Sequence, residues 1–232
     1  MFKDQVAVVT GASSGIGKAI ALQLAAQGAK LYLLGRNLET LAATAQNIQT
    51  DVKICQVDLT KSAEIRQLKT FVGQVDLLVH SAGVISLGEL QTAPVEDLDW
   101  QYQTNVRAPY LLTQTLLPLM IPVKGQIVFI NSTGGLNSRG GMGQYSATKH
   151  ALKAIADSLR DEINHLGMRV LSVYPGRTAS PMQAAVYEKE GKVYNPDRLL
   201  QPQDVADVVL NALSLPRTAE VTDISVRPLV KG

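Results

Sequence analysis

Tyr145 and Lys149 stand four residues apart at the start of a segment, 144–166, whose recurring apolar residues predict a long helix. Residues four apart lie on one helix face, so we expect the phenol and the ammonium to be neighbours. A phenol with its ordinary pKa of about 10 is a poor acid or base at neutral pH. A nearby ammonium lowers that pKa, which suits the pair to proton transfer. A Tyr-x-x-x-Lys pair also occurs by chance in many helices, so the pair alone is a weak indication.

Ser132 follows an apolar run, 126–131, that predicts a buried strand. A hydroxyl at the carboxyl end of a strand can donate a hydrogen bond to a substrate oxygen. The alternative is a serine of an ordinary turn, since Thr133 stands beside it.

A glycine-rich segment, Thr10-Gly11-Ala12-Ser13-Ser14-Gly15-Ile16-Gly17, joins a predicted strand at 6–10 to a predicted helix at 15–27. Glycines there let the backbone turn tightly and approach a pyrophosphate, and the helix N-terminus offers free N–H groups to it. Position between the first strand and the first helix makes this motif stronger than a glycine trio alone. The alternative, a glycine-rich turn with no ligand, ranks below a dinucleotide site.

The second predicted strand, 30–34, is followed by Gly35 and Arg36. An Asp or Glu at this strand end would hold the ribose 2′-hydroxyl of NAD. An arginine can instead pair with a 2′-phosphate and stack on adenine, which favours NADP over NAD. A solvated loop arginine is the competing interpretation.

Strand and helix patterns alternate along the whole chain. Most of the strand runs are continuously apolar, which is typical of strands buried on both faces. The alternation predicts an α/β fold, a doubly wound parallel sheet of about seven strands with helices on both faces, in a single domain over 1–232. The predicted strands are 6–10, 30–34, 53–57, 77–80, 126–131, 169–173 and 220–226, and the predicted helices are 15–27, 38–48, 63–71, 95–119 with a break near Asn105, 144–166 and 203–213.

The segment 177–200 shows no clear periodicity and follows the sixth strand, where ligands bind in such sheets. We interpret it as a candidate substrate lid, with a plain surface loop as the alternative. Arg139 and Arg177 are placed near the expected substrate mouth and could meet an anionic substrate, although loop arginines are usually solvated. Met142, Met182 and Tyr187 could line the same mouth.

Composition excludes several other classes of protein. The 232 residues include 46% apolar and 18% charged residues with a net charge of +2, and no basic run is interleaved with aromatic residues, so nucleic-acid binding is not expected. Cys55 is the only cysteine, which excludes an intrachain disulfide and a cysteine-based zinc cluster, and no metal site is expected. No apolar run reaches the ~20 residues that span a bilayer. Because the N-terminal residues also lack a signal-peptide pattern, we expect no membrane association and a cytoplasmic location.

These motifs together resemble the short-chain dehydrogenase/reductase family over essentially the full length of the chain. The family's glycine motif matches 10–17, its Tyr-x-x-x-Lys matches Tyr145 and Lys149, its serine falls on Ser132, and its asparagine falls on Asn105. The resemblance implies a Rossmann-type fold and a role for each residue. Tyr145 exchanges a proton with the substrate oxygen, Lys149 lowers the tyrosine pKa and binds the nicotinamide ribose, and Ser132 polarises the carbonyl. Asn105 holds a water that relays protons to Lys149.

The resemblance also implies a nicotinamide cofactor, and Arg36 favours NADP over NAD. The Asp after the third strand and the Pro-Gly turn after the sixth are further family features. The implied contacts are Gly11, Ser13, Ser14, Gly15, Ile16, Gly17, Arg36, Asp58, Leu59, Ser81, Ala82, Gly83, Tyr145, Lys149, Pro175, Gly176, Thr178 and Ser180.

The chain departs from the family at His80-Ser81-Ala82-Gly83, where Asn-Asn-Ala-Gly is common. We interpret His80 as a hydrogen-bonded histidine at a strand end rather than a catalytic one. The segment 60–74 is short, which trims a peripheral helix and should leave the site intact.

The implied function is an NADP(H)-dependent oxidoreductase that interconverts a small carbonyl compound and an alcohol, in a homodimer or homotetramer. A non-catalytic NADP(H)-binding regulator or redox sensor is the alternative, since a fold does not prove catalysis. An epimerase or lyase on the same scaffold is a third possibility.

Overall fold

Seven parallel strands form one sheet in the computed structural model, which describes residues 1–230. The strand order is β3-β2-β1-β4-β5-β6-β7, so the direction of winding reverses between β1 and β4. This arrangement confirms the predicted doubly wound sheet. The strands are β1 (Val6–Thr10), β2 (Lys30–Gly35), β3 (Val52–Gln56), β4 (Leu77–His80), β5 (Gln126–Ile130), β6 (Arg169–Pro175) and β7 (Asp223–Val226).

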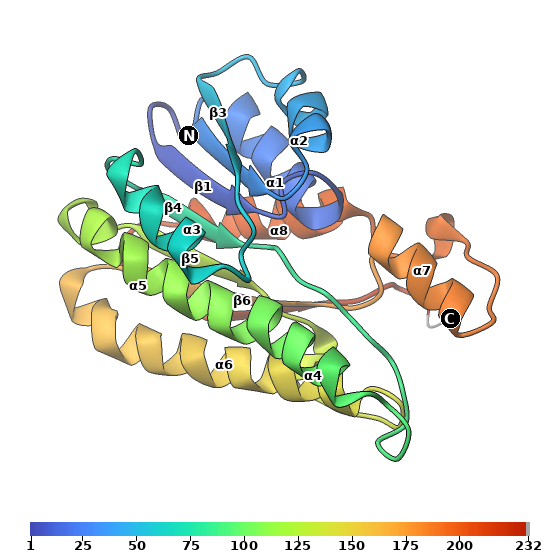
Figure 1. The fold of residues 1–232 in the computed structure, drawn as a ribbon. Coiled ribbons are helices and arrows are strands. Elements are labelled where there is room, and N and C mark those ends of the chain that lie inside the picture. The colour runs from blue at the N-terminus through green and yellow to red at the C-terminus, as the bar shows by residue number, and fades with distance from the viewer. Residues whose placement is uncertain (231–232) are drawn as a thin grey trace.

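Helices cover both faces of the sheet (Figure 1). One face carries α1 (Gly15–Ala26), α2 (Leu38–Ala45) and α8 (Pro202–Leu213). The opposite face carries α3 (Ser62–Gln67), α5 (Ala108–Met120) and α6 (Gly143–Ile163), and α4 (Val95–Tyr102) packs beside the start of α6. The helix α7 (Pro181–Lys189) lies beyond the end of the sheet (Figure 1). No helix in the described part of the chain is long and apolar enough to cross a membrane.

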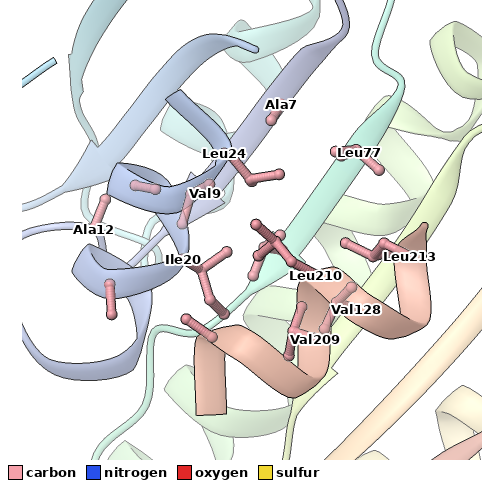
Figure 2. Packing of buried hydrophobic residues seen from close by; sticks show 14 of the residues in the cluster. Ala7, Val9, Ala12, Ile20, Leu24, Leu77, Val128, Val209, Leu210 and Leu213 are labelled. Atoms are coloured by element: carbon pink, nitrogen blue, oxygen red, sulfur yellow. The ribbon is translucent and has the colours of Figure 1, made fainter. Parts of the chain in front are cut away.

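The core on the first face joins the two ends of the chain. Figure 2 shows Ile20 and Leu24 of α1 packed with Leu210 of α8 above the apolar strands. All three side chains are 4% exposed or less. Because fully burying one such side chain is worth about 1.5–3 kcal/mol, this contact holds α1, which begins at the glycine-rich segment, firmly against the sheet.

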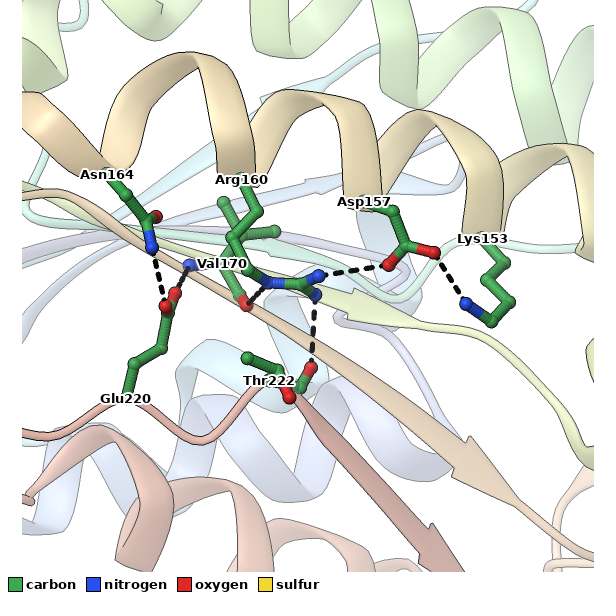
Figure 3. Close-up of polar contacts among 7 residues, drawn as sticks. All are labelled: Lys153, Asp157, Arg160, Asn164, Val170, Glu220 and Thr222. Atoms are coloured by element: carbon green, nitrogen blue, oxygen red, sulfur yellow. Dashed lines mark hydrogen bonds and ion pairs between the residues drawn. The ribbon is translucent and has the colours of Figure 1, made fainter.

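Polar contacts fix α6, which carries Tyr145 and Lys149, to the edge of the sheet (Figure 3). The Arg160 guanidinium donates to the carbonyls of Val170 (3.1 Å) and Thr222 (3.2 Å). The Glu220 carboxylate accepts from the Val170 N–H (2.8 Å) and from the Asn164 side chain (2.7 Å). Side chains therefore satisfy backbone groups between α6, β6 and the segment before β7.

Two of the differences between the predicted segments and the structure lie after β6. The 177–200 segment contains the helix α7, in which Val186 is the only buried residue, so the helix leaves no apolar periodicity in the sequence. The last strand begins at Asp223 rather than at Glu220, whose side chain is bonded to β6 and α6.

His80 is buried in β4, as interpreted from the sequence. Its Nε2 lies 2.8 Å from the Thr113 hydroxyl, and its ring stacks on Phe129 with centroids 4.8 Å apart. Burial lowers the pKa of His80 to about 3, so the ring is neutral in the folded protein at physiological pH. Cys55 is partly buried in the edge strand β3.

Candidate active site

A cavity of about 640 Å³ opens at the carboxyl ends of the strands, where the strand order reverses between β1 and β4. This is the expected position of a ligand in a doubly wound sheet. The cavity is lined by all the residues predicted to contact the cofactor except Gly17, and by Ser132. Asn105 does not line it. Segments from at least six strand ends thus meet at one place, which sequence spacing alone does not show.

The glycine-rich segment forms a tight turn under the start of α1. Gly11 and Gly15 have φ of +65° and +52°, a left-handed conformation that other residues rarely adopt. A Cβ built at Gly11 would lie 2.9 Å from the backbone nitrogen of Ala82, and one at Gly17 would lie 2.5 Å from the Gly11 carbonyl oxygen. Gly17 is buried below the turn and does not line the cavity, so its contact with the cofactor stays a prediction.

The N-terminus of α1 is suited to an anion. Its N-cap, Ser14, makes no side-chain capping hydrogen bond, and the first turn contains no acidic residue. The N–H groups of that turn therefore stay available, and the positive end of the helix dipole faces the cavity without a competing carboxylate. These features fit a pyrophosphate.

Thr10 connects the glycine-rich turn to the loop after β4. Its hydroxyl oxygen accepts from the N–H groups of Ser81 and Ala82, both at 3.0 Å. From the sequence, Thr10 was placed at the end of a strand and at the start of the glycine-rich motif, with no contact assigned to its side chain. The contact joins segments about seventy residues apart, so no local pattern indicates it.

Arg36 and Asp58 line the cavity from the ends of β2 and β3. Hydrogen bonds from Thr60, whose N–H and hydroxyl donate to one Asp58 oxygen at 3.0 and 2.8 Å, hold the pKa of that carboxyl below its usual range. Arg36 makes no ion pair within residues 1–230, so its guanidinium is available to a ligand.

Ser132 and Tyr145 converge on one point. A Cβ built at Gly134 would lie 3.3 Å from Cε1 of Tyr145 and 3.4 Å from the Ser132 hydroxyl oxygen. That hydroxyl accepts from the Gly134 N–H at 3.0 Å, which leaves its own hydrogen available. Gly134 was not singled out from the sequence, although any larger residue there would press on both side chains.

Lys149 lies behind Tyr145. Its Nζ is 5.9 Å from the centre of the Tyr145 ring and donates to the Ile130 carbonyl at 3.1 Å. Burial lowers the pKa of Lys149 to about 8. Burial also raises the pKa of Tyr145, with the Ser132 hydroxyl acting in the opposite direction. Burial is thus the main influence on the Tyr145 pKa here, and the lowering by Lys149 stays a prediction.

Asn105 braces the site from outside the cavity. It lies in a π-helical turn, Gln103–Arg107, at the break predicted between the two helices. Its amide oxygen accepts from the Val84 N–H (2.8 Å), and its amide nitrogen donates to the Val84 carbonyl (2.9 Å) and the Thr148 hydroxyl (3.1 Å). Both hydrogens of the side-chain amide are thus used. The predicted water would therefore have to bind the main chain of Asn105.

Asn131 is a site residue that sequence analysis missed. Its side chain donates to the Lys149 carbonyl at 3.0 Å and accepts from the Ser132 N–H at 2.9 Å. It is buried, and a Cβ at Gly135 would lie only 2.5 Å from its amide oxygen. Asn131 therefore sets the distance between β5 and α6. An amide directly after an apolar strand was the available signal.

Comparison with known proteins identifies the family. A model of the short chain dehydrogenases matches residues 5–191. The chain belongs to the short chain dehydrogenase family. It is 34% identical over 232 residues to an uncharacterized oxidoreductase of Staphylococcus epidermidis, with 98% of each chain covered. A serine dehydrogenase complexed with NADP⁺ superposes with a TM-score of 0.90 at 26% identity, over 98% of this chain and 96% of that one. A metagenomic short-chain oxidoreductase in complex with NADP gives a TM-score of 0.84 at 32% identity, over 99% of both chains.

In this short chain dehydrogenase, the segment after β6 passes over the cavity. Thr178 pairs with Leu200, and the Ser180 hydroxyl caps α7 by accepting from the Gln183 N–H at 3.2 Å. A Cβ built at Gly15 would lie 3.4 Å from the Cβ of Ser180, so the start of α7 is close to the start of α1. Membership of the family makes the protein an oxidoreductase with a nicotinamide dinucleotide site.

Proposed function

We propose that this protein is an NADP(H)-dependent oxidoreductase that interconverts a carbonyl and an alcohol on a small substrate, with Tyr145 as general acid and base. One observation carries the proposal. Ser132, Tyr145 and Lys149, from the end of β5 and the start of α6, line the same cavity as the glycine-rich turn.

Each side chain has a part in this reaction. The nicotinamide, when bound, supplies or accepts the hydride. Ser132 donates its available hydroxyl hydrogen to the substrate oxygen and orients it. Tyr145 gives that oxygen a proton in reduction and removes one in oxidation. Lys149 binds the nicotinamide ribose and keeps positive charge near the phenol.

The preference for NADP is part of the proposal. Arg36 is available at the end of β2, where Gly35 occupies the place of the acidic residue that would hold a ribose 2′-hydroxyl. Two of the similar structures are described with NADP. We expect Arg36→Gln to raise the KM for NADPH about tenfold or more and to change the KM for NADH little, because the lost interaction is with a phosphate.

The central experiment uses Tyr145→Phe. NADPH oxidation is followed with a panel of ketones, aldehydes and oxo acids, and NADPH binding is measured by calorimetry in the same preparations. Tyr145→Phe should lose nearly all turnover and keep its NADPH affinity, whereas Tyr110→Phe, an exposed tyrosine on α5, should keep both.

Full turnover in Tyr145→Phe would disprove the assigned mechanism. NADPH binding by the unaltered protein with no turnover on any substrate would instead favour a regulator or redox sensor.

We also propose that the protein forms a homodimer or homotetramer. Trp100, Tyr102 and Tyr110 on and after α4 are 40–54% exposed, which is unusual for large aromatic residues. A molar mass from light scattering that matches one chain would contradict this.

A further inference from the structure

One part of the cavity differs in character from the rest. We call it the substrate end, and it is formed by the loop after β4, the turn before α6 and the helix α7. Its polar lining consists of Asn137, Ser138 and Gln183. This end is also lined by the apolar Leu87, Met142, Met182 and Val186 and by the charged Arg139 and Glu190.

The negative charge of the substrate end is already neutralised. Arg177 donates to both oxygens of Glu190 (2.5 and 2.8 Å), and Lys192 lies 2.9 Å from one of them. The Arg177 guanidinium holds the pKa of Glu190 down at about 2, so the carboxylate stays charged and paired. Arg177 also packs on the Tyr187 ring at 4.8 Å. Arg177 is therefore committed to this cluster, which has two cations for one anion.

Arg139 has no such partner. Its Nε lies 2.9 Å from the Met142 sulfur, a weak acceptor, and no carboxylate within residues 1–230 is in ion-pair distance of it. The turn that carries it is well fixed. The Met142 N–H donates to the Arg139 carbonyl (3.2 Å), and the Gly88 N–H donates to the Gly141 carbonyl (3.0 Å).

Arg139 is an exposed arginine without a carboxylate partner on a turn that lines the cavity, so its guanidinium is free to bind an anion. A guanidinium offers two parallel N–H donors that match the oxygens of a carboxylate, and such charge-assisted bonds are stronger than neutral ones. Arg139 precedes Tyr145 by six residues on the turn that leads into α6, so a carboxylate on Arg139 and a carbonyl at Tyr145 can belong to one small molecule. The methionine and aliphatic side chains around them suit the carbon chain between.

We propose that this short chain dehydrogenase acts on an oxo acid or hydroxy acid, and that Arg139 binds the substrate carboxylate. The inference rests on the proposed function and names its substrate class. Arg139 is a specificity-determining residue, and the hydride and proton transfers do not pass through it.

The test compares oxo acids with their uncharged esters. Pyruvate, acetoacetate and levulinate, in which the carbonyl and carboxylate are progressively farther apart, are each assayed with NADPH beside their methyl esters. The variants are Arg139→Gln and, as a control with the same charge change, Arg66→Gln, an exposed arginine on α3 outside the cavity.

We expect the unaltered protein to reduce at least one acid with a kcat/KM about tenfold or more above that of its ester. Arg139→Gln should remove that preference through KM and leave the ester unchanged. Arg66→Gln should behave as the unaltered protein. An ester that is used as well as its acid, or an equal loss for both in Arg139→Gln, would overturn the proposal.

A binding measurement separates this proposal from the proposed function. Calorimetry with Tyr145→Phe saturated with NADPH reports acid binding without turnover. Binding of an oxo acid there, lost on adding Arg139→Gln, supports the carboxylate site even if catalysis fails in every assay. Absence of binding by all three acids overturns the carboxylate site even if the esters are reduced and the proposed function holds.

Discussion

The two ends of the cavity differ in what determines their shape. The nucleotide end is shaped by backbone, with Gly11 and Gly15 in left-handed conformations and a Cβ excluded at Gly17. The substrate end is shaped by side chains on a turn and on α7, joined by the ion pairs of Glu190. The backbone turn of the nucleotide end requires glycine at fixed positions in the sequence. The side-chain contacts of the substrate end depend instead on which residues face one another across the cavity. The shape of the nucleotide end is therefore fixed by the fold. The side chains of the substrate end can vary and so adapt the same fold to different substrates.

The largest expected effect concerns the strand that supports the nucleotide end. His80 has a folded pKa of about 3 against an ordinary value of 6.5, so the unfolded chain binds more protons between these values. The free energy of unfolding therefore does not depend on His80 protonation above pH 6.5. As the pH falls from 6.5 to about 3, this residue lowers it by at most about 5 kcal/mol. Chemical denaturation across this range should show His80→Asn with a flatter pH profile, although less stable at pH 7 because the Phe129 stacking is lost.

His165→Asn is the matched control, since His165 is exposed, and it should keep the slope of the unaltered protein. The same pH dependence of stability in all three proteins would show that burial of His80 does not lower its pKa.

The second prediction compares two glycines with the same positive φ. Gly11 and Gly191 both have φ of +65°, but a Cβ at Gly11 meets Ala82 backbone, whereas one at Gly191 meets nothing within 4 Å. Gly191→Ala should cost only the strain of the left-handed conformation, about 1 kcal/mol. Gly11→Ala should cost about 3 kcal/mol and weaken NADPH binding at least tenfold. Thermal unfolding and calorimetric titration with NADPH provide the two measurements.

Equal losses of stability for the two alanine variants would mean that contact of the new Cβ with the Ala82 backbone adds nothing to the cost of the left-handed conformation. The nucleotide end would then owe its shape to conformation alone.

Much of the site could be predicted because it follows local rules. The spacing of Tyr145 and Lys149 on one helix, and the glycines between β1 and α1, are fixed by helix geometry and by the turn. The alternation of apolar runs predicted the sheet because strands buried on both faces leave continuous apolar sequence.

The rest could not be predicted because it depends on contacts across the fold. Thr10 and Asn131 act through backbone groups of distant segments, which leave no periodic pattern. The helix α7 was missed because Val186 alone is buried in it. Burial raises the pKa of Tyr145 in this structure, an influence that the spacing of Tyr145 and Lys149 does not indicate.

The third prediction concerns the cost of keeping Lys149 in the site. Burial lowers its pKa from 10.5 to about 8, so the folded state disfavours the ammonium at neutral pH. Lys149→Met should raise stability at pH 7 by about 2 kcal/mol, since up to about 3 kcal/mol of burial cost is removed and the bond to the Ile130 carbonyl is lost. The difference should shrink between pH 8 and 10.5, where the unfolded chain retains the proton longer and the unaltered protein gains stability.

Denaturant titrations at several pH values check this, with NADPH affinity expected to fall in the variant. A variant less stable than the unaltered protein at pH 7 would show that Lys149 stabilises the site it serves.

The smallest effect is expected at the substrate end. Glu190 has a pKa of about 2, held low by Arg177, so its ion pair contributes stability above pH 4.5 that is lost as the pH falls to about 2. Because the pair joins only the segment before α7 to the residue that ends α7, Glu190→Gln should lower global stability by about 1 kcal/mol while making α7 clearly more sensitive to proteolysis. Glu188→Gln, on the same helix and exposed, should change neither. NADPH affinity should stay unchanged in Glu190→Gln, because the glycine turn is built without side-chain ion pairs. A parallel loss of NADPH affinity would mean that the two ends of the cavity are coupled through Ser180, where α7 begins beside α1.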